Sequence, residues 1–501
     1  MKLFSASQIK NWEARTISQL NSDTELMERA AKACVESLKN VYDRSESFLV
    51  FCGMGSNGGD GLCITRFFAE AGYQSRAIIV KHRDKYSEAT LHQLEKLKKY
   101  NADLVTEIEE GFSIKNFSSS IVVIDAILGT GTNRPLDGLL ADVVHYVNDL
   151  NNLKISIELP TGLAVDDVPA PDHTILNADA TLTFQQMKRC MLHEEARAFC
   201  GVVEVLDIGL DAQFVHSTST PYSMVSHAMM KSIYRPRSEF GHKGTFGTAH
   251  IIAGSDGMAG AATLACTAAL RSGAGKVIAH VPKSNVLPLQ INIGEAICKV
   301  CGENEISPLP EAKNLKHVLV GPGIGIGVGA RRAMRTLIED ITAPLVIDAD
   351  GINLLAQDLD LLDKIPEGSI LTPHVAEFER LFGQAHNSLH RVDMARREAM
   401  KYNLHIVLKG HFTSIIQPDG SCFYNTTGNS GMATAGSGDV LAGIIVGLLA
   451  RGYSSTHAAL LGVYFHGLSG DFAALKLSQE AVMARDINDH LGKAFLTLGK
   501  S

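Results

Sequence analysis

The chain has 501 residues, of which 46 are Lys or Arg and 54 are Asp or Glu, so its formal net charge is −8. Apolar residues make up 45% and charged residues 20%, a composition that excludes a disordered chain and is typical of large buried cores. At roughly 100–200 residues per domain, this length predicts two or three domains. The acidic balance argues against the broad basic surface that nucleic acids and anionic membranes require, so we expect neither partner.

Cysteine usage and hydropathy predict a cytoplasmic protein. An odd, scattered set of cysteines, several inside apolar runs, is typical of reduced thiols. Cys298 and Cys301 form a lone CxxC pair, which we interpret as part of a strand or its edge. The first 20 residues carry Glu13 and no apolar signal core. The longest apolar stretch, Val440–Ala450, is shorter than the roughly 20 residues of a membrane span. The nine cysteines are Cys34, Cys52, Cys63, Cys190, Cys200, Cys266, Cys298, Cys301 and Cys422.

The first half of the chain alternates helical and extended patterns. Residues 25–38 and 62–71 have helical apolar spacing. Buried strands separated by helix-length segments predict βαβ units and a mostly parallel sheet with helices on both faces. The predicted strands are Ser47–Cys52, Arg76–Val80, Ile121–Ala126, Lys154–Leu159, Thr181–Phe184 and Val202–Leu206.

The alternation stops in the polar, Ser/Thr-rich segment 211–232, where we place the domain junction. A second α/β pattern follows and ends in long helices, including 439–450 and 455–465. The sequence thus predicts an α/β protein of two three-layer domains, residues 1–215 and 225–501. We expect a homo-oligomer, because such domains with long apolar helices often associate. The predicted strands of the second domain are His250–Ala253, Val277–Val281, Val318–Val320, Leu345–Asp348, Ser369–Leu371, Ile406–Leu408 and Ser414–Ile416.

The first glycine cluster, residues 53–58, fits the pattern GxGxxG between a strand and a helix. Such a loop can bring backbone N–H groups close to a phosphate, but it also occurs as a purely structural tight turn. The next predicted strand reads RAIIVKHRD and lacks the ribose-binding acid of an ordinary NAD site.

Oxygen-bearing side chains follow three strands of the predicted first sheet. Asn57 and Asp60 lie in the glycine cluster, Asp125 ends a strand before a second glycine loop, and Glu158 and Thr161 follow the next strand. Taken singly, each is a helix cap or turn residue. Together they predict a ligand crevice at one sheet edge, where the oxygens of Asn57, Asp125 and Thr161 can hold a hard cation.

The motifs NGGDG, VVIDAILGTG, ELPTGL and LMERA resemble the N-terminal domain of the NAD(P)H-hydrate repair enzymes over roughly residues 1–210. The resemblance implies a Rossmann-like epimerase that interconverts the R and S forms of hydrated NADH and NADPH. It also implies K⁺ binding at Asn57, Asp125 and Thr161, and general-base catalysis by Glu158. The family has Asp at 158, Asn at 56 and Ser at 161, so the geometry of the longer Glu158 differs. The implied substrate-binding residues are Ser56, Asn57, Gly58, Gly59, Asp60, Gly129, Thr130, Gly131, Thr132, Asn133, Arg134, Pro135 and Glu158.

The strongest local signal is the second glycine cluster, Gly428–Gly443, which runs directly into an apolar helix. Backbone N–H groups of Gly436, Ser437 and Gly438 are placed to bind a phosphate at the helix N-terminus. Asp439, in the first turn, can accept a proton from an attacking hydroxyl. The simpler alternative is a capping Asp after a glycine turn.

This GxGD pattern resembles the ribokinase-like superfamily, and HKGTFG, GPGIG, DADGINLL, LTPHVAEFERL and VLKGHFT resemble its ADP/ATP-dependent NAD(P)H-hydrate dehydratases over residues 231–490. The resemblance implies ADP-dependent dehydration of the S hydrate, with Asp439 as the base and a Mg²⁺ water shell ordered by Glu377. For Glu377 and Asp350 a structural hydrogen-bonding role is an equal alternative. The implied substrate contacts are Ala261, Gly323, Gly325, His374 and Asp439. The implied nucleotide contacts are Lys409, Gly410, His411, Phe412, Thr413, Gly436, Ser437 and Gly438.

Two other hypotheses remain open. The second domain could phosphorylate a small alcohol, such as a vitamin precursor, and release the phosphorylated product. The first domain could be a non-catalytic ligand-binding module, and Ser56 and Glu158 are the features that keep this alternative open.

Overall fold

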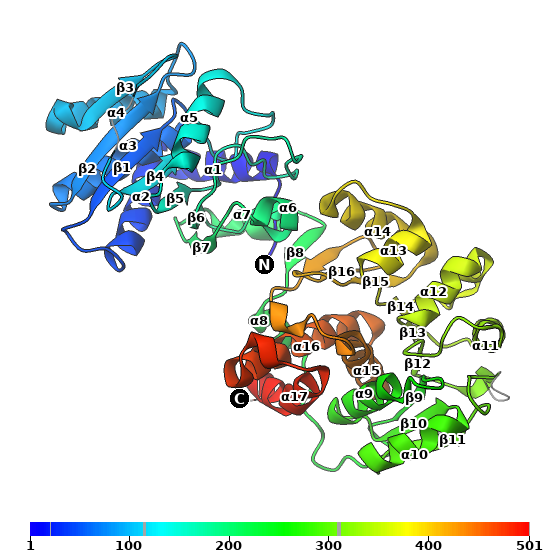
Figure 1. Cartoon of the computed structure of the whole chain (residues 1–501). Coiled ribbons are helices and arrows are strands. Elements are labelled where there is room, and N and C mark those ends of the chain that lie inside the picture. Colours follow the sequence, from blue (N-terminus) through cyan, green and yellow to red (C-terminus); the bar gives the residue numbers. More distant parts are fainter. Residues whose placement is uncertain (21, 114–116, 308–311, 500–501) are drawn as a thin grey trace. The chain divides into compact units, whose positions relative to one another are not determined.

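The computed structural model describes residues 1–20, 22–113, 117–307 and 312–499 (Figure 1). The chain forms two compact units. One comprises Lys2–Thr220 with Asn387–Leu389, and the other comprises Met1, Pro221–His386 and His390–Ser501. The main division falls between residues 220 and 221, inside the polar segment 211–232, and the predicted limits at 215 and 225 flank it.

The first unit is built on a seven-stranded sheet in which all neighbouring strands run parallel. The spatial order is β3-β2-β1-β4-β5-β6-β7, so the chain starts inside the sheet and crosses over after β3. The strands are β1 Ser47–Cys52, β2 Gln74–Val80, β3 Val105–Ile108, β4 Val122–Ala126, β5 Lys154–Ile157, β6 Ala180–Phe184 and β7 Val202–Leu206.

Both faces of this sheet are covered, which explains why its central strand β1 is almost continuously apolar. In β1, Phe48 and Val50 join the cluster that contains α1 to α4, whereas Leu49 and Phe51 join the cluster of α5 on the opposite face. Figure 1 shows these helices around the sheet. The helices are α1 Ala6–Leu20, α2 Asp23–Lys39, α3 Ser56–Glu70, α4 Glu88–Asn101, α5 Gly138–Asp149, α6 Glu194–Arg197 and α7 Ala212–Ser217.

The second unit contains a ten-stranded sheet of order β11-β10-β9-β12-β13-β14-β15-β16-β17-β8. The strands from β11 to β15 are parallel, β16 and β17 follow antiparallel, and β8 pairs parallel with β17. The strands are β8 Tyr222–Met224, β9 Thr248–Ile252, β10 Lys276–Val281, β11 Ile297–Val300, β12 Val318–Val320, β13 Leu345–Ile347, β14 Ile370–Leu371, β15 His405–Leu408, β16 Ser414–Ile416 and β17 Cys422–Tyr424.

Helices also cover both faces of the second sheet. One cluster joins Leu319 and Val346 to α9, α15, α16 and α17, and the opposite cluster joins Val320 and Ile347 to α11 and α12. The helices are α8 His227–Ile233, α9 Ala259–Arg271, α10 Lys283–Asn292, α11 Val328–Asp340, α12 Asp350–Gln357, α13 Val375–Phe382, α14 Ser388–Tyr402, α15 Ser437–Ala450, α16 Ser455–Leu477 and α17 Ala484–Gly499.

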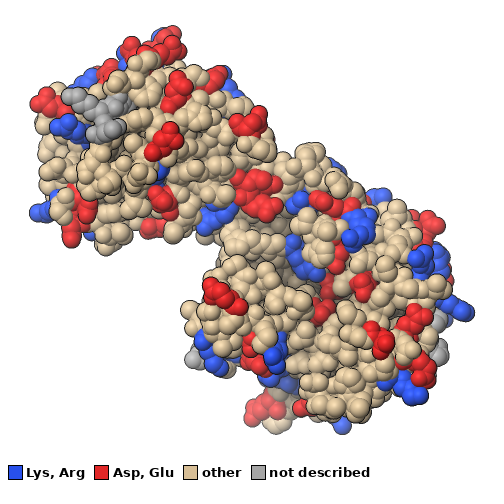
Figure 2. Space-filling model, in the orientation of Figure 1, with Lys and Arg blue, Asp and Glu red and all other residues tan. Residues whose placement is uncertain are grey.

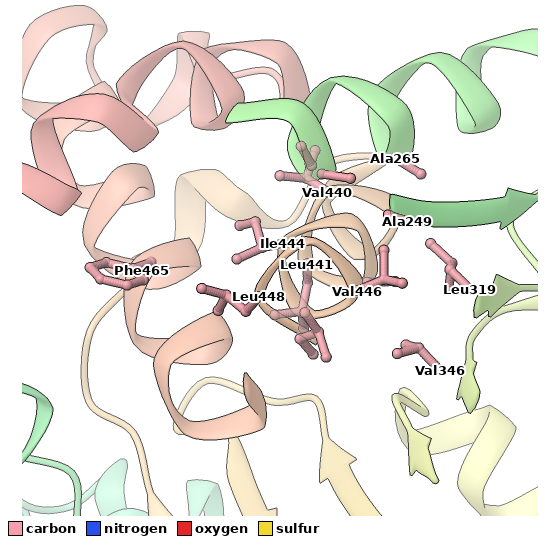
Figure 3. Packing of buried hydrophobic residues seen from close by; sticks show 14 of the residues in the cluster. Ala249, Ala265, Leu319, Val346, Val440, Leu441, Ile444, Val446, Leu448 and Phe465 are labelled. Atoms are coloured by element: carbon pink, nitrogen blue, oxygen red, sulfur yellow. The ribbon is translucent and has the colours of Figure 1, made fainter. Parts of the chain in front are cut away.

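Helix α15 lies at the centre of the second unit. Every residue from Val440 to Ala450 is buried, so this helix has no polar face. Its side chains point toward strands β9, β12 and β13 on one side and toward Phe465 of α16 on another (Figure 3). Gly443 and Gly447, one turn apart, allow α9 to approach: a Cβ on Gly443 would overlap the Ala265 carbonyl oxygen.

Helix α16 is long and apolar enough, by length and composition, to cross a membrane. However, 67% of its most apolar window is buried inside the unit, where it packs on α15 and α17. We therefore interpret α16 as a core helix. Figure 2 shows Lys and Arg side chains interspersed with Asp and Glu on the visible face.

The predicted α/β class with two layered, mostly parallel domains is confirmed. Two local predictions are wrong. Helix α3 begins at Ser56 rather than at Leu62, so Ser56–Asp60 form helix and not a loop. Strand β5 ends at Ile157 because Glu158 takes a positive φ of 68°. The pattern also does not predict β3, β8, β11 and β17, which are three or four residues long.

The α9–α15 contact generates a stability prediction. In Gly443→Ala the new Cβ would lie 2.7 Å from the Ala268 Cβ as well as on the Ala265 carbonyl oxygen. Overpacking of this kind costs about 1–3 kcal/mol, so the midpoint of thermal unfolding should fall. Gly492→Ala is the matched control, because a Cβ on this exposed helical glycine would meet nothing within 4 Å. That variant should gain about 0.5–1 kcal/mol. Equal midpoints for the two variants would contradict the packing argument.

Candidate active sites

Asp125 organises the first candidate site, at the carboxyl ends of β4 and β5. Its Oδ1 accepts hydrogen bonds from Thr161 Oγ1 (2.6 Å) and Ile127 N (3.1 Å). Its Oδ2 accepts from Ser156 Oγ and Thr161 N, both at 2.9 Å. Burial raises the pKa of Asp125, and these four hydrogen bonds oppose that rise. The structure therefore brings Asp125 and Thr161 into contact.

Asn57 completes the predicted set of cation ligands. Its Nδ2 donates to the carbonyl oxygens of Leu128 (3.0 Å) and Ile157 (3.2 Å), which places it beside the ends of β4 and β5. Its Oδ1 is buried and accepts no hydrogen bond from the described residues. An unpartnered buried oxygen is costly, and a hard cation is one way to satisfy it. The oxygens of Asn57, Thr161 and Asp125 therefore fit a cation such as K⁺.

The glycine loop after β4 lies against Asn57. A Cβ on Gly129 would lie 3.2 Å from Asn57 Cγ, so a side chain there would press on the amide. Beyond it, Thr132 bonds back to the Gly129 carbonyl oxygen through both its N (3.3 Å) and its Oγ1 (3.2 Å). The remaining predicted loop residues are half-buried or exposed and include Thr130, Gly131, Asn133, Arg134 and Pro135. The loop therefore borders the Asn57 site and is open to solvent.

Glu158 forms a buried ion pair that the sequence does not predict. Its Oε1 lies 2.8 Å from Lys188 Nζ, and the two side chains are only 7% and 1% exposed. Its Oε2 accepts from Phe184 N (2.7 Å) and Thr183 Oγ1 (3.4 Å). The carboxylate thus faces the end of β6, and neither oxygen bonds to Asn57 or Asp125. Lys188, and not a member of the predicted cation set, is therefore the charged partner of Glu158.

Strained turns hold this ion pair. Glu158 and Gln185, just after β5 and β6, have φ values of 68° and 62°. In both turns the next amide bonds to the residue before it: Leu159 N to Ile157 O (2.8 Å) and Gln186 N to Phe184 O (2.7 Å). Non-glycine residues in this region cost on the order of 1–3 kcal/mol each and cluster at functional sites.

Two further carboxyl groups lie in the field of Glu158. Asp60, on the same face of α3 as Asn57, is buried, and burial together with Glu158 and Glu13 raises its pKa well above the usual range. Burial and Glu158 also raise the pKa of Glu13 to about 7. The Glu158–Lys188 ion pair therefore has two neighbouring carboxyl groups whose pKa values are raised.

The second candidate site is built around Lys409, just after β15. Lys409 Nζ lies 3.0 Å from Asp348 Oδ1 and 3.8 Å from Glu377 Oε2. Thr372 Oγ1 donates to the same Asp348 oxygen (2.7 Å). The ends of β13, β14 and β15 thus deliver Asp348, Thr372 and Lys409 to one place.

Asp439 joins this group from the N-terminus of α15. Burial raises its pKa to about 7, Asp348 adds to the rise, and Lys409 opposes it. The preceding residue is in contact with the same group, since a Cβ on Gly438 would lie 3.2 Å from Lys409 Nζ. Gly436, the N-cap, has a φ of 90°, a left-handed conformation that favours glycine. The backbone N–H groups at this helix end are therefore beside a lysine, which suits an anion.

The structure gives each predicted hydrate-binding residue a local partner. A Cβ on Gly323, whose φ is 61°, would lie 3.1 Å from the Ala261 Cβ, so these two residues are neighbours. Gly325 N donates to Asp350 Oδ2 (2.9 Å). His374 caps α13: its Nδ1 accepts from Ala376 N (3.1 Å) and Glu377 N (3.3 Å).

Glu377 closes a capping box on His374, because its Oε2 accepts from His374 N (2.8 Å). Glu377 therefore has the structural hydrogen-bonding role considered as its alternative. Asp350 has one too, because it accepts a hydrogen bond from Gly325 N. Both carboxylates nevertheless contribute to the field at Asp439. Of the predicted nucleotide contacts that follow Lys409, Gly410 and His411 are exposed, and Phe412 and Thr413 are half-buried.

The donor set fits Mg²⁺ carried by a nucleotide better than a resident metal. Asp348, Asp350 and Glu377 all raise the pKa of Asp439, while the Lys409 ammonium opposes that rise. Among the described residues, no group of three or more His, Cys, Asp or Glu is arranged to hold a metal. Mg²⁺ usually keeps several waters and binds through one or two carboxylates and phosphates, so this group of acids is consistent with it.

The sequence interpretation misses several residues of these sites. Asp348 stands in the DADGINLL motif beside Asp350, and the spacing alone does not separate their roles. Lys188 and Glu13 carry no local signal, because only the fold brings them to Glu158. His466 and Asp471 of α16 contact the second glycine cluster and lie within an apolar helical pattern that conceals them.

Comparisons with known proteins agree with this geometry. The family described as NAD(P)H-hydrate dehydratase matches residues 249–493, and the family described as YjeF-related protein N-terminus matches residues 23–190. A bifunctional NAD(P)H-hydrate repair enzyme of Moorella thermoacetica is 34% identical over 483 residues, which cover 93% of this chain and 91% of that protein. The chain belongs to the family of bifunctional NAD(P)H-hydrate repair enzymes. The resemblance stated for the sequence is confirmed.

Other similar proteins have the same description. The bifunctional NAD(P)H-hydrate repair enzyme of Coxiella burnetii is 30% identical over 492 residues, 98% of each chain. A solved structure, the ADP/ATP-dependent NAD(P)H-hydrate dehydratase of Bacillus subtilis co-crystallised with ATP/Mg²⁺, is 29% identical. It covers 55% of this chain and 98% of its own length, with a TM-score of 0.49.

The raised pKa of Asp439 generates a prediction about stability. Between about pH 4 and pH 7 the folded protein holds a proton that the unfolded chain has released, so stability falls as pH rises through this window. Asp439→Asn removes that penalty. Its gain in unfolding free energy over wild type should grow by about 2 kcal/mol between pH 5 and pH 8. The gain is measured by denaturant unfolding at both pH values. Asp360→Asn, at an exposed position of the same unit, should show no such pH dependence; a constant difference for Asp439→Asn would refute the assigned cause.

Proposed function

We propose that the protein repairs hydrated NADH and NADPH in two steps. The first unit epimerises the R and S hydrates. The second unit dehydrates the S hydrate to NAD(P)H and converts ADP to AMP and inorganic phosphate. The observation that carries the proposal is the placement of Asp439, whose pKa is raised to about 7, beside Lys409 at the glycine-rich N-terminus of α15.

The dehydration can be written with these residues. The hydroxyl oxygen of the hydrate attacks the terminal phosphorus of ADP, the new O–P bond forms, and the P–O bond to AMP breaks. Asp439 takes the hydroxyl proton, and the amides of Gly436, Ser437 and Gly438 with Lys409 stabilise the phosphoryl charge. The phosphate then leaves with the C–O electron pair, the neighbouring carbon loses a proton to water, and the ring double bond is restored.

Lys409–Thr413 are proposed to bind the nucleotide, and Ala261, Gly323, Gly325 and His374 the hydrate. The carboxylates of Asp348 and Glu377 would hold Mg²⁺ through its waters, and the ion would supply charge neutralisation of the phosphates. The choice of ADP rather than ATP as the phosphoryl donor rests on the resemblance of this chain to the two-domain NAD(P)H-hydrate repair enzymes.

In the first unit we propose Glu158 as the epimerase base. Lys188 and Phe184 N hold its carboxylate, and Asn57, Asp60 and the Gly129–Pro135 loop bind the hydrate. Asn57, Asp125 and Thr161 would hold K⁺, which supplies a fixed positive charge beside the substrate. Ser56 replaces the family Asn at the start of α3.

The enzyme is proposed to act in the cytoplasm as a homo-oligomer. Eight of the nine cysteines are buried, which suits the reduced thiols of a reducing compartment. The small-molecule substrates need no extended basic surface, in keeping with a net charge of −8.

The test is incubation with mixed R and S NADH hydrate, ADP and Mg²⁺, followed by NADH absorbance. Full restoration with AMP and phosphate as products is expected. Restoration of about half the material would show a dehydratase with a non-catalytic first unit, and a free phosphorylated product would support the small-alcohol kinase alternative.

Asp439→Asn should abolish dehydration while ADP binding is retained. Asn preserves the helix end but cannot accept the proton, and a general base typically supplies about 10²–10⁴-fold. For wild type, kcat/KM should rise with pH through about 7, because only the ionised carboxylate acts as the base. Retention of more than about a tenth of wild-type turnover, or a rate that does not rise through neutral pH, would remove Asp439 from this role.

Glu158→Gln should stop conversion of the R hydrate while the second unit dehydrates the S hydrate at the wild-type rate. Gln cannot take the proton, and it also breaks the ion pair with buried Lys188, so thermal unfolding must show that the first unit is folded. Glu158→Asp restores the family residue and should keep or raise epimerisation.

Two outcomes decide the role of Glu158. If Glu158→Gln epimerises as fast as wild type, the assignment of the base is wrong. If wild type converts no R hydrate whereas Glu158→Asp does, the first unit of the natural protein is a non-catalytic module.

A further inference from the structure

The start of the glycine-rich segment that carries the proposed phosphate site is hydrogen-bonded to helix α16. Asp471 Oδ2 accepts a hydrogen bond from Gly428 N (3.0 Å), and Oδ1 accepts from Asn429 Nδ2 (2.9 Å). Asn429 Oδ1 in turn accepts from Gly431 N (3.0 Å). One carboxylate therefore fixes the first two residues of the segment, and Asn429 extends the bonded chain to Gly431.

The end of the segment, at Ser437, is also in contact with α16. His466 Nε2 lies 2.9 Å from the Ser437 carbonyl oxygen and 3.2 Å from Ser437 Oγ. Burial lowers the pKa of His466 to about 4, so the ring is neutral at physiological pH. Because a carbonyl oxygen only accepts, the single ring N–H lies on Nε2. His466 thus holds the first residue of α15, two positions before Asp439.

Glycines of α16 let the segment lie directly on the helix. A Cβ on Gly467 would lie 2.5 Å from the Thr427 carbonyl oxygen, and one on Gly470 would lie 2.6 Å from Met432 Cγ. Larger residues at these two positions would lift the segment. The contact therefore extends from residue 427 to residue 437.

The same helix reaches the proposed nucleotide segment through one asparagine. Thr427 Oγ1 donates to the Tyr464 carbonyl oxygen (3.2 Å), and Asn425 Nδ2 donates to the Thr427 carbonyl oxygen (3.0 Å). Asn425 N then donates to the Thr413 carbonyl oxygen (2.9 Å). A continuous set of hydrogen bonds thus joins α16 to residue 413.

We propose that Asp471 is a positioning residue of the dehydratase, which holds segment 428–438 in its anion-binding conformation. The inference rests on the proposed function, because it assigns that segment to the transferring phosphate. Amide donors stabilise phosphoryl charge only where they are already placed, and a misplacement of about 1 Å can cost about 100-fold. Asp471 acts through Gly428 and Asn429 and contacts no substrate.

The test uses the full-length protein and a reversal of donor and acceptor. In Asp471→Asn the new side-chain NH₂ group faces the Asn429 NH₂ group, so two donors oppose each other. If the new amide rotates, its NH₂ group faces Gly428 N instead, which then has no acceptor. The affinity of this variant for ADP with Mg²⁺, measured by calorimetry, should fall about tenfold or more, and kcat of dehydration should fall with it. The double variant Asn429→Asp with Asp471→Asn restores all three hydrogen bonds, because residue 471 then donates to residue 429, and should recover most of the affinity.

Asp489→Asn, which removes one charge from an exposed ion pair with Arg271, is the matched control and should bind ADP as wild type does. Wild-type affinity in Asp471→Asn would overturn the role of Asp471. A weak single variant that the double variant does not rescue would overturn hydrogen-bonded positioning. Failure of wild type itself to bind ADP or ATP would instead overturn the proposed function.

Discussion

In each unit, one lysine forms an ion pair with a buried carboxylate at the carboxyl ends of parallel strands, where several acids gather. Lys188 binds Glu158 at 2.8 Å, and Lys409 binds Asp348 at 3.0 Å. A carboxylate removed from water needs such a partner, because burial without one drives it to its protonated form. The remaining acids, Asp60 and Asp439, lie beside the pair and keep raised pKa values. Each site therefore combines a lysine–carboxylate ion pair with neighbouring acids whose pKa values are raised.

The fold supplies these lysines by the same rule in both units. Parallel strands deliver their carboxyl ends to one edge, so residues distant in sequence meet there. Glu158 follows β5 while Lys188 comes just after β6, and Asp348 follows β13 while Lys409 follows β15. The cost appears in the backbone, since Glu158, Gln185 and Ala349 take positive φ values where the chain leaves the sheet. Three of the six non-glycine residues with positive φ among the described residues therefore lie beside the two sites.

The sequence predicts the layers well because central strands such as β1 and β4 are buried on both faces, and it predicts the glycine segments because few other residues allow close backbone approach. It fails where the deciding contact is tertiary. Ser56–Asp60 looks like a loop from its glycines, yet Gly58 and Gly61 pack against the chain at Gly53 and Ala126, and the segment is helical. Lys188 carries no motif, and β8 is a strand only because Cys422–Tyr424 pairs with it. Residue propensities and motif spacing carry no information about these tertiary contacts.

The burial of α15 connects the core of the second unit to its chemistry. A helix with a polar face can rotate or slide against its neighbours at modest cost, whereas α15 is buried from Val440 to Ala450. Gly443 and Gly447 fix its distance from α9, and Phe465 packs beside it from α16 (Figure 3). Since interiors are close-packed, its N-terminus has one position relative to the strand ends that carry Asp348 and Lys409. The contact of Gly438 with Lys409 therefore follows from packing that lies up to three turns away, and the core itself aims the anion-binding end of the helix.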